Sequence, residues 1–240
     1  MGASSLLQQF KKASLAIAIA ASIAPLPAFA SSSTYGFGAI TSNSAIDPGI
    51  GEAQLFVEVY DTGLGAGQAG FRFYNTGPLA SSITDVYFDD GTLLGISSVI
   101  NMLGVSFTGG SASPPNLPSG NNINFNTSAG FLADSDAPAQ PNGVNPGEEL
   151  RIIFNLINGT TYNDLISALE LGLDNPGVDM LGGLRIGIHV QGFADGQSEA
   201  FVNGGCVIDC RPDDQGSVPE PGTLALIGVG LMGLAARRKS

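Results

Sequence analysis

The sequence predicts a mainly β protein, built as a single antiparallel β-sandwich or jelly-roll-like domain with one short helix. Two observations support this fold class. Gly and Pro are abundant, with 34 and 14 copies in 240 residues, and short apolar or aromatic runs recur between them. Side chains along these runs alternate with a period of two, the pattern of half-buried strands. Many short strands separated by turns are typical of a sandwich or a jelly roll.

Eight runs carry this strand pattern. They are residues 55–60, 71–74, 83–88, 99–107, 123–125, 150–157, 184–190 and 199–202. Gly, Asn, Asp and Pro lie between them and supply the turns. Residues 109–149 consist mostly of these turn-forming types and Ser. We expect a long loop there, and loops of that length are usually functional or mobile.

One segment breaks the strand pattern and predicts a helix. Its apolar residues at helical spacing are Leu165, Ile166, Leu169 and Leu173. Thr161 or Asn163 can cap its start, because short polar side chains accept hydrogen bonds from the first free amides. The Asn-Pro-Gly sequence at 175–177 ends it. We expect this helix to cross one end of the sandwich.

Residues 1–30 have the three regions of a secretory signal peptide. Two lysines precede an apolar, helix-forming stretch at 13–24, and two prolines then break the helix. Ala28 and Ala30 fit the small-x-small pattern of a signal-peptidase site. We therefore expect export through the Sec translocon and cleavage by signal peptidase after Ala30.

Residues 218–240 contain a second apolar segment. Pro219, Glu220 and Pro221 form a rigid turn before the apolar run at 223–236. Fourteen helical residues span about 21 Å, which is short for a hydrocarbon core of about 30 Å. Snorkelling cations and local thinning can close that gap. The cations that follow the run and favour the cytoplasmic side are Arg237, Arg238 and Lys239. We expect a short transmembrane helix at 223–236.

This layout resembles the PEP-CTERM sorting tail of exosortase substrates, which is also labelled an ice-binding protein C-terminal domain. The resemblance implies that Pro219, Glu220 and Pro221 are the recognition element for an exosortase. It also implies transient anchoring in the inner membrane, then delivery to the cell envelope, the outer surface or the extracellular matrix. Such a tail occurs on many unrelated domains, so it implies nothing about residues 31–208, the predicted extracytoplasmic domain.

The charge between the two sorting segments is strongly negative. Residues 31–217 hold 20 of the 21 acids against four arginines and no lysine, or about −16. A phosphate backbone would be repelled, so nucleic acid is excluded as a partner. Such acidity suits calcium or a hydrated exopolysaccharide. It is also common on secreted proteins that bind neither.

Cys206 and Cys210 are the only cysteines. Because export leads to an oxidising compartment, we expect them to form a disulfide. Residues 209–217 are polar and contain a proline, so we expect a linker to the tail there.

Few residues could support catalysis. No G-x-S-x-G nucleophile motif occurs, and His189 is the only histidine. His189 lies in a predicted strand, either with the apolar residues facing the core or with Arg185 and Gly187 on the other face. The carboxylate pairs that could serve a glycosidase are Asp89 with Asp90, Asp134 with Asp136, and Glu148 with Glu149. Four of these acids lie in Asp-rich turns that could bind calcium through oxygen: Asp89, Asp90, Asp134 and Asp136.

These observations favour a non-enzymatic structural or adhesive protein of the envelope or matrix. The first alternative is a calcium-dependent carbohydrate-binding module. Such a module needs exposed aromatic side chains, and the chain has no Trp. Its tyrosines are Tyr35, Tyr60, Tyr74, Tyr87 and Tyr162. The second alternative, with less support, is an envelope glycoside hydrolase.

Overall fold

The computed structural model describes residues 32–89, 94–127, 132–174 and 183–208. These residues form ten strands with few short helices. The strands are β1 (Ser32–Ala39), β2 (Leu55–Tyr60), β3 (Gln68–Asn75), β4 (Ser82–Asp89), β5 (Leu94–Asn101), β6 (Phe107–Gly109), β7 (Leu132–Ser135), β8 (Glu149–Leu156), β9 (Arg185–Gln191) and β10 (Glu199–Ile208). The helices are α1 (Asp47–Gln54), the 3₁₀ helix η1 (Gly120–Ile123), α2 (Ala139–Asn142) and α3 (Tyr162–Asp174).

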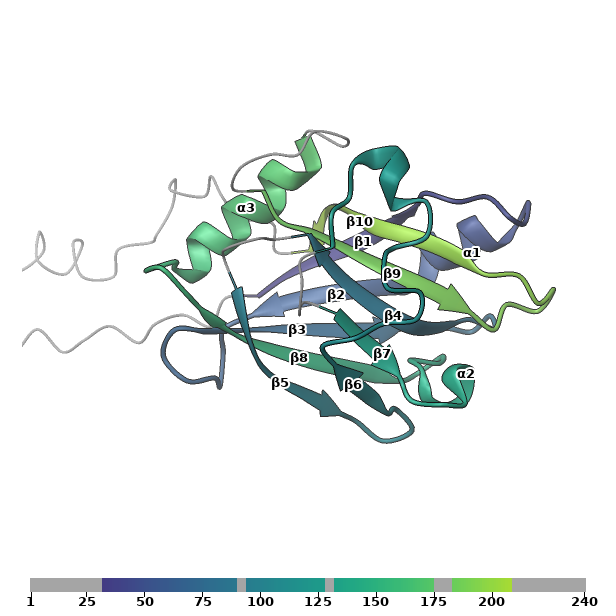
Figure 1. Ribbon diagram of the computed structural model, residues 1–240, viewed down its shortest axis with the longest axis horizontal. Helices are drawn as coiled ribbons and strands as arrows, with labels where there is room; N and C mark the ends of the chain where they lie inside the picture. The colour runs from purple at the N-terminus through teal and green to yellow at the C-terminus, as the bar shows by residue number, and fades with distance from the viewer. Residues whose placement is uncertain (1–31, 90–93, 128–131, 175–182, 209–240) are drawn as a thin grey trace, which may run out of the picture.

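All ten strands belong to one antiparallel sheet that is nearly closed into a barrel-like shape (Figure 1). The strand order is β5-β8-β3-β2-β1-β10-β9-β4-β7-β6, so β1 and β10 are neighbours in its middle. The two edge strands also come close together, since a Cβ on Gly109 of β6 would lie 3.1 Å from Val99 of β5. The prediction of a mainly β, antiparallel domain is confirmed.

The arrangement differs from the predicted sandwich of two sheets. Alternation along a strand specifies which face is buried, but not which strand lies beside it. Here each strand continues the same sheet, and its curvature brings one face inward to form the core.

The interior of the barrel is filled by aromatic side chains from opposite parts of the sheet. Phe71 of β3 packs edge-on against Phe88 of β4 and Phe154 of β8, with ring centroids 5.2 and 5.3 Å apart. All three rings are at most 1% exposed. Burying a side chain of this size contributes about 1.5–3 kcal/mol, and the edge-to-face geometry adds to it.

Six of the eight predicted strands coincide with observed strands, and a seventh, the run at 99–107, overlaps only the end of β5 and the start of β6. The prediction at 123–125 is wrong. Residue 123 ends η1, and Asn124 follows in the left-handed conformation with φ of 49°. The carbonyl groups of Ile123 and Asn124 accept hydrogen bonds from Arg185 instead of a neighbouring strand.

Two strands were not predicted. β1 is rich in Ser and Gly, which have low strand propensity. β7 has only four residues and lies inside the Gly- and Pro-rich region predicted as a loop.

The predicted helix is confirmed as α3, and it lies at one end of the strands, opposite α1 and α2 (Figure 1). Thr161 caps it: the Asp164 amide donates to Thr161 Oγ1 at 3.2 Å, and the Thr161 amide donates to the Asp164 carboxylate at 2.8 Å. Leu165 and Leu169 are fully buried against the barrel. The sequence predicted one helix, whereas the structure also has α1, η1 and α2.

Within the described ranges, no helix is long and apolar enough to cross a bilayer. The predicted signal helix and the predicted transmembrane segment at 223–236 lie outside those ranges.

Candidate functional site

The outer face of β2 and β3 presents three half-buried aromatic rings, which together with Arg72 we call the aromatic face: Phe56, Tyr60, Arg72 and Tyr74. The register pairs Phe56 with Tyr74 and Tyr60 with Gly70. The Phe56 and Tyr74 rings stack with centroids 5.6 Å apart, and the Arg72 guanidinium lies 4.7 Å from the Tyr74 centroid. The Tyr60 ring lies against Gly70, where a Cβ would come within 2.3 Å of it.

Charged side chains lie between these rings and balance one another. Arg72 donates to Glu58 at 2.8 Å and to Glu149 at 2.6 Å, and Glu149 also accepts from Arg151 at 2.5 Å. Burial raises the pKa of Glu149, but the hydrogen bonds from Arg72 and Arg151 outweigh it and leave that pKa lowered. The two arginines and two glutamates on this face therefore balance in charge, on a protein that is otherwise strongly acidic.

A second group of polar residues forms a row across three neighbouring strands on the outer face of the barrel. The register pairs Asp134 of β7 with Asp85 of β4, and Asp85 with His189 of β9. His189 Nδ1 lies 2.9 Å from Asp85 Oδ2. The β4–β9 register shifts beside Asp85, and such a bulge re-aims the side chains next to it. His189 thus lies on the same face as Arg185 and Gly187, away from the core.

The loop at 110–127 covers part of this outer face. The Ser113 amide donates to Asp85 Oδ1 at 3.2 Å, and Tyr87 Oη donates to the Pro114 carbonyl at 2.8 Å. Leu117 packs against Gly187: a Cβ on Gly187 would lie 2.7 Å from a methyl carbon of Leu117. These contacts make Asp85 and Tyr87 anchors for the loop, which explains why β4 is buried on both faces.

The side chains of the Asp134–Asp85–His189 row contact one another. Within the residues described, Asp85 is the one hydrogen-bond partner of the His189 ring, so no nucleophile is poised beside it. Burial, followed by a hydrogen bond with Asp85, raises the pKa of Asp134 to about 6. Two carboxyl groups in hydrogen-bond contact are closer than the ~5 Å that a retaining glycosidase needs.

Three of the four residues predicted to bind calcium are described, and each has different partners. Asp89 is paired with the Arg185 guanidinium, with Nε 3.0 Å from Oδ2. Asp136 accepts hydrogen bonds from the hydroxyl groups of Ser106 and Thr108 at 2.6 and 2.8 Å. Asp134 lies in the row above, and Asp90 lies outside the described residues.

Calcium binding at those four positions therefore stays a prediction. Across the described ranges, no three Asp, Glu, His or Cys side chains converge as a ready-made metal site. Of the third carboxylate pair, Glu148 accepts from the Asn145 amide at 2.9 Å, and Glu149 is held by the two arginines of the aromatic face.

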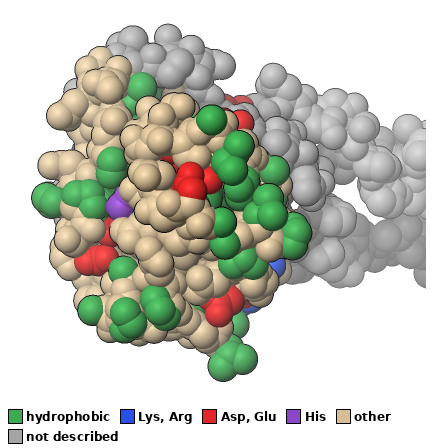
Figure 2. Space-filling view, turned by 90° about the vertical axis from the view of Figure 1, so that its right-hand side faces the viewer, with side chains coloured by type: hydrophobic (Ala, Val, Ile, Leu, Met, Phe, Trp, Pro, Cys, Tyr) green, Lys and Arg blue, Asp and Glu red, His purple; other side chains and the backbone are tan. Residues whose placement is uncertain are grey.

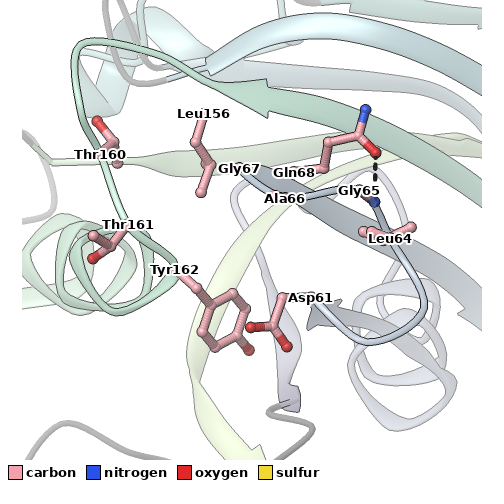
Figure 3. Close-up of a pocket in the computed structure, with 10 residues that line it drawn as sticks. All are labelled: Asp61, Leu64, Gly65, Ala66, Gly67, Gln68, Leu156, Thr160, Thr161 and Tyr162. Atoms are coloured by element: carbon pink, nitrogen blue, oxygen red, sulfur yellow. Dashed lines mark hydrogen bonds between the residues drawn. The ribbon is translucent and has the colours of Figure 1, made fainter. Parts of the chain in front are cut away.

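An open cavity of about 370 Å³ lies where the β2–β3 turn meets the start of α3 (Figure 3). Tyr162 projects into it from α3, and Asp61 is the only acid among its lining residues. Tyr162 Oη donates to the Val59 carbonyl at 2.9 Å, and burial raises its pKa. One carboxyl group cannot supply the acid–base pair of a glycosidase.

A further pair of acids lies where α1 begins. Burial, followed by a hydrogen bond with Asp195, raises the pKa of Asp47 to about 6. Hydrogen bonds, first from the Gln197 amide, lower the pKa of Asp195. Neither this pair nor Asp85 was recognised in the sequence, because contacts between distant segments leave no local pattern.

The sorting and cysteine predictions lie outside the part of the chain whose side chains are described. These residues are Ala28, Ala30, Cys206, Cys210, Pro219, Glu220, Pro221, Arg237, Arg238 and Lys239. For Cys206 the structure gives a backbone position only, opposite Tyr35.

Together these features define the class of protein: an acidic, antiparallel β-barrel-like domain. A PEP-CTERM protein-sorting motif matches residues 217–239. The chain therefore carries the sorting motif of exosortase substrates, which marks an exported protein sorted to the cell surface. No curated protein and no solved structure matches the chain.

Proposed function

We propose that this protein is a structural or adhesive component of the cell envelope or extracellular matrix, without enzymatic activity. The sorting motif at 217–239 is the observation that carries the proposal. In this proposal a signal peptide at 1–30 directs the chain to the Sec translocon, and signal peptidase removes it. The segment at 223–236 then holds the protein briefly in the inner membrane until an exosortase acts.

The barrel supports a non-enzymatic role. Three acids of its outer face are held by other side chains: Glu149 by arginines, Asp136 by hydroxyl groups and Asp134 by Asp85. A barrel-like sheet also leaves few free strand edges, which suits a protein that must persist outside the cell.

Fractionation of cells tests this proposal. The full chain and a chain lacking residues 218–240 are expressed in a host with an active exosortase. The full chain should reach the surface or matrix fraction, and the truncated chain should be released or retained elsewhere. The same distribution for both chains would contradict the proposal.

A second candidate function is carbohydrate binding at the aromatic face. Sugar rings stack on exposed aromatic side chains, and arginine and glutamate side chains bind their hydroxyl groups. Phe56 and Tyr60 lie four residues apart, or about 13 Å along the strand, which suits a short stretch of an extended polysaccharide. The observation that favours it is the stacked Phe56–Tyr74 pair beside Arg72.

Binding of the full chain to exopolysaccharide from the host, with and without a chelator, tests this function. The double variant Phe56→Ala, Tyr74→Ala should lose most binding. Leu103→Ala is the control, since Leu103 is 97% exposed and lies between β5 and β6 rather than on β2 or β3. Equal binding by both variants would exclude the aromatic face, and a loss of binding with chelator would show calcium dependence.

A further inference from the structure

The start of α1 and the turn between β9 and β10 bring Asp47 and Asp195 into contact at one end of the barrel, with Glu199 nearby. Asp47 is the first residue of α1, Asp195 lies in the turn, and Glu199 is the first residue of β10. Asp47 and Glu199 are each only 1% exposed. Acidic side chains occur in several groups on this end of the molecule, with hardly any basic side chain in view (Figure 2).

The surrounding loop is ordered around Glu199. The Ser44 amide donates to Glu199 Oε1 at 2.8 Å, and Thr41 Oγ1 donates to Oε2. Thr41 Oγ1 also accepts from the Ala200 amide at 2.8 Å. Both carboxylate oxygens of Glu199 therefore accept hydrogen bonds. Glu199 adds negative charge here, but neither of its oxygens lacks a donor.

Asp47 is different, because one of its oxygens is buried without a partner. Oδ2 of Asp47 is shielded from solvent and, among the described residues, no hydrogen-bond donor reaches it. The carboxyl group of Asp47 lies in hydrogen-bond contact with the Asp195 carboxyl group and with the Ser44 side chain. A buried carboxylate oxygen without a donor is costly, and a second carboxylate beside it raises that cost.

In the part of the chain that the structure describes, no arginine pairs with these acids. Arg72 and Arg151 pair with Glu149, and Arg185 pairs with Asp89. These are the three arginines in the described part of the chain, and residues 31–217 contain no lysine. Within the described ranges, Asp47, Asp195 and Glu199 therefore have no cationic partner.

We propose that Asp47 and Asp195 bind a Ca²⁺ ion, with Glu199 adding to the negative charge of the site. Ca²⁺ accepts six to eight oxygen ligands in flexible geometry, so water and main-chain oxygens can complete a site with two carboxylates. Mg²⁺ requires a stricter octahedral arrangement and gives up its water reluctantly. Two carboxylate ligands suit the weak affinity of extracellular calcium modules, with Kd of about 10⁻⁴–10⁻³ M.

Thermal unfolding and calorimetric titration with CaCl₂ test the proposal on the full chain, purified in a chelator and then dialysed. Saturating Ca²⁺ should raise Tm by about 3–6 °C, and the same concentration of MgCl₂ should raise it much less. Asp47→Asn and Asp195→Asn should each abolish the response to Ca²⁺. Both replacements keep the side-chain shape and remove repulsion, so the variants should fold; Asp195 is also exposed.

Glu52→Gln is the matched control, because Glu52 is an exposed acid of the same helix α1 and its carboxylate accepts a hydrogen bond from the Ala39 amide. This variant should keep the full response to Ca²⁺. The proposal is overturned if Ca²⁺ neither binds nor raises Tm in the wild-type protein. It is also overturned if Asp47→Asn and Asp195→Asn respond as strongly as the control.

Discussion

The Asn101 side chain hydrogen-bonds to both backbone polar groups of Phe107. Nδ2 donates to the Phe107 carbonyl at 3.1 Å, and the Phe107 amide donates to Oδ1 at 2.8 Å. Asn101 ends β5 and Phe107 begins β6, the two strands at opposite ends of the sheet order. The place where β5 and β6 meet is the seam of the barrel. There the Asn101 side chain makes the pair of hydrogen bonds that the backbone of a neighbouring strand would make.

Replacing Asn101 should open this seam. Asn101→Ala removes both hydrogen bonds to Phe107, which is itself 3% exposed. We expect the free energy of unfolding to fall by about 1–2 kcal/mol, measured by urea denaturation. Exchange of the Phe107 amide hydrogen should also become faster. Ser98→Ala, at an exposed position of the same strand, is the control. Equal stability of the two variants would mean that the seam contributes nothing.

Two glycines of α1 should respond in opposite ways to the same substitution. A Cβ on Gly51 would lie 2.2 Å from the buried ring of Phe201, whereas a Cβ on Gly49 would meet nothing within 4 Å. Gly51→Ala should therefore lower the free energy of unfolding by about 1–3 kcal/mol through overpacking. Gly49→Ala should raise it by about 0.5–1 kcal/mol, because alanine favours the helix. Thermal unfolding of both variants measures the difference, and a destabilised Gly49→Ala would contradict this packing of α1.

The raised pKa of Asp134 should make stability depend on pH. Its pKa in the folded protein is about 6, against an ordinary value of 3.8. The folded chain therefore holds more protons than the unfolded chain between about pH 4 and pH 6, and stability falls as the pH rises through that range.

Asp134→Asn removes this group from titration. The free energy of unfolding of the variant, relative to that of the wild-type protein, should rise by about 1 kcal/mol from pH 4 to pH 7. This figure allows for solvent screening. Urea denaturation at both pH values measures it, with the neighbouring Asp85, Asp136 and His189 left unchanged. If the free energies of unfolding of the two proteins differ by the same amount at both pH values, the Asp85–Asp134 contact does not make stability depend on pH.

Local patterns predicted most elements but not their arrangement. Alternation identified β2 and β8, and the spacing of Leu165 and Leu169 identified α3, because each depends on neighbours a few residues away. The barrel depends on which strands lie side by side, and the pairing of β1 with β10 joins the two ends of the domain.

The candidate sites show the same limit. The tyrosines could be named from the sequence, but the stacking of Tyr74 on Phe56 requires the register of β2 and β3. Asp47 and Asp195 are 148 positions apart and meet only in the folded chain. The sorting motif was recognised without a fold, because a processing enzyme recognises a short local sequence.

The mass and location of the mature protein test most directly whether the tail is a delivery signal separate from the barrel. Pro219, Glu220 and Pro221 are replaced together by Ala, and Pro212→Ala, outside the matched residues, serves as control. In a host with an active exosortase, the wild-type and control proteins should lose the tail and reach the cell surface. The triple variant should keep the mass of its tail and remain in the membrane fraction. Equal masses and equal surface delivery for all three proteins would contradict exosortase sorting through Pro219–Pro221.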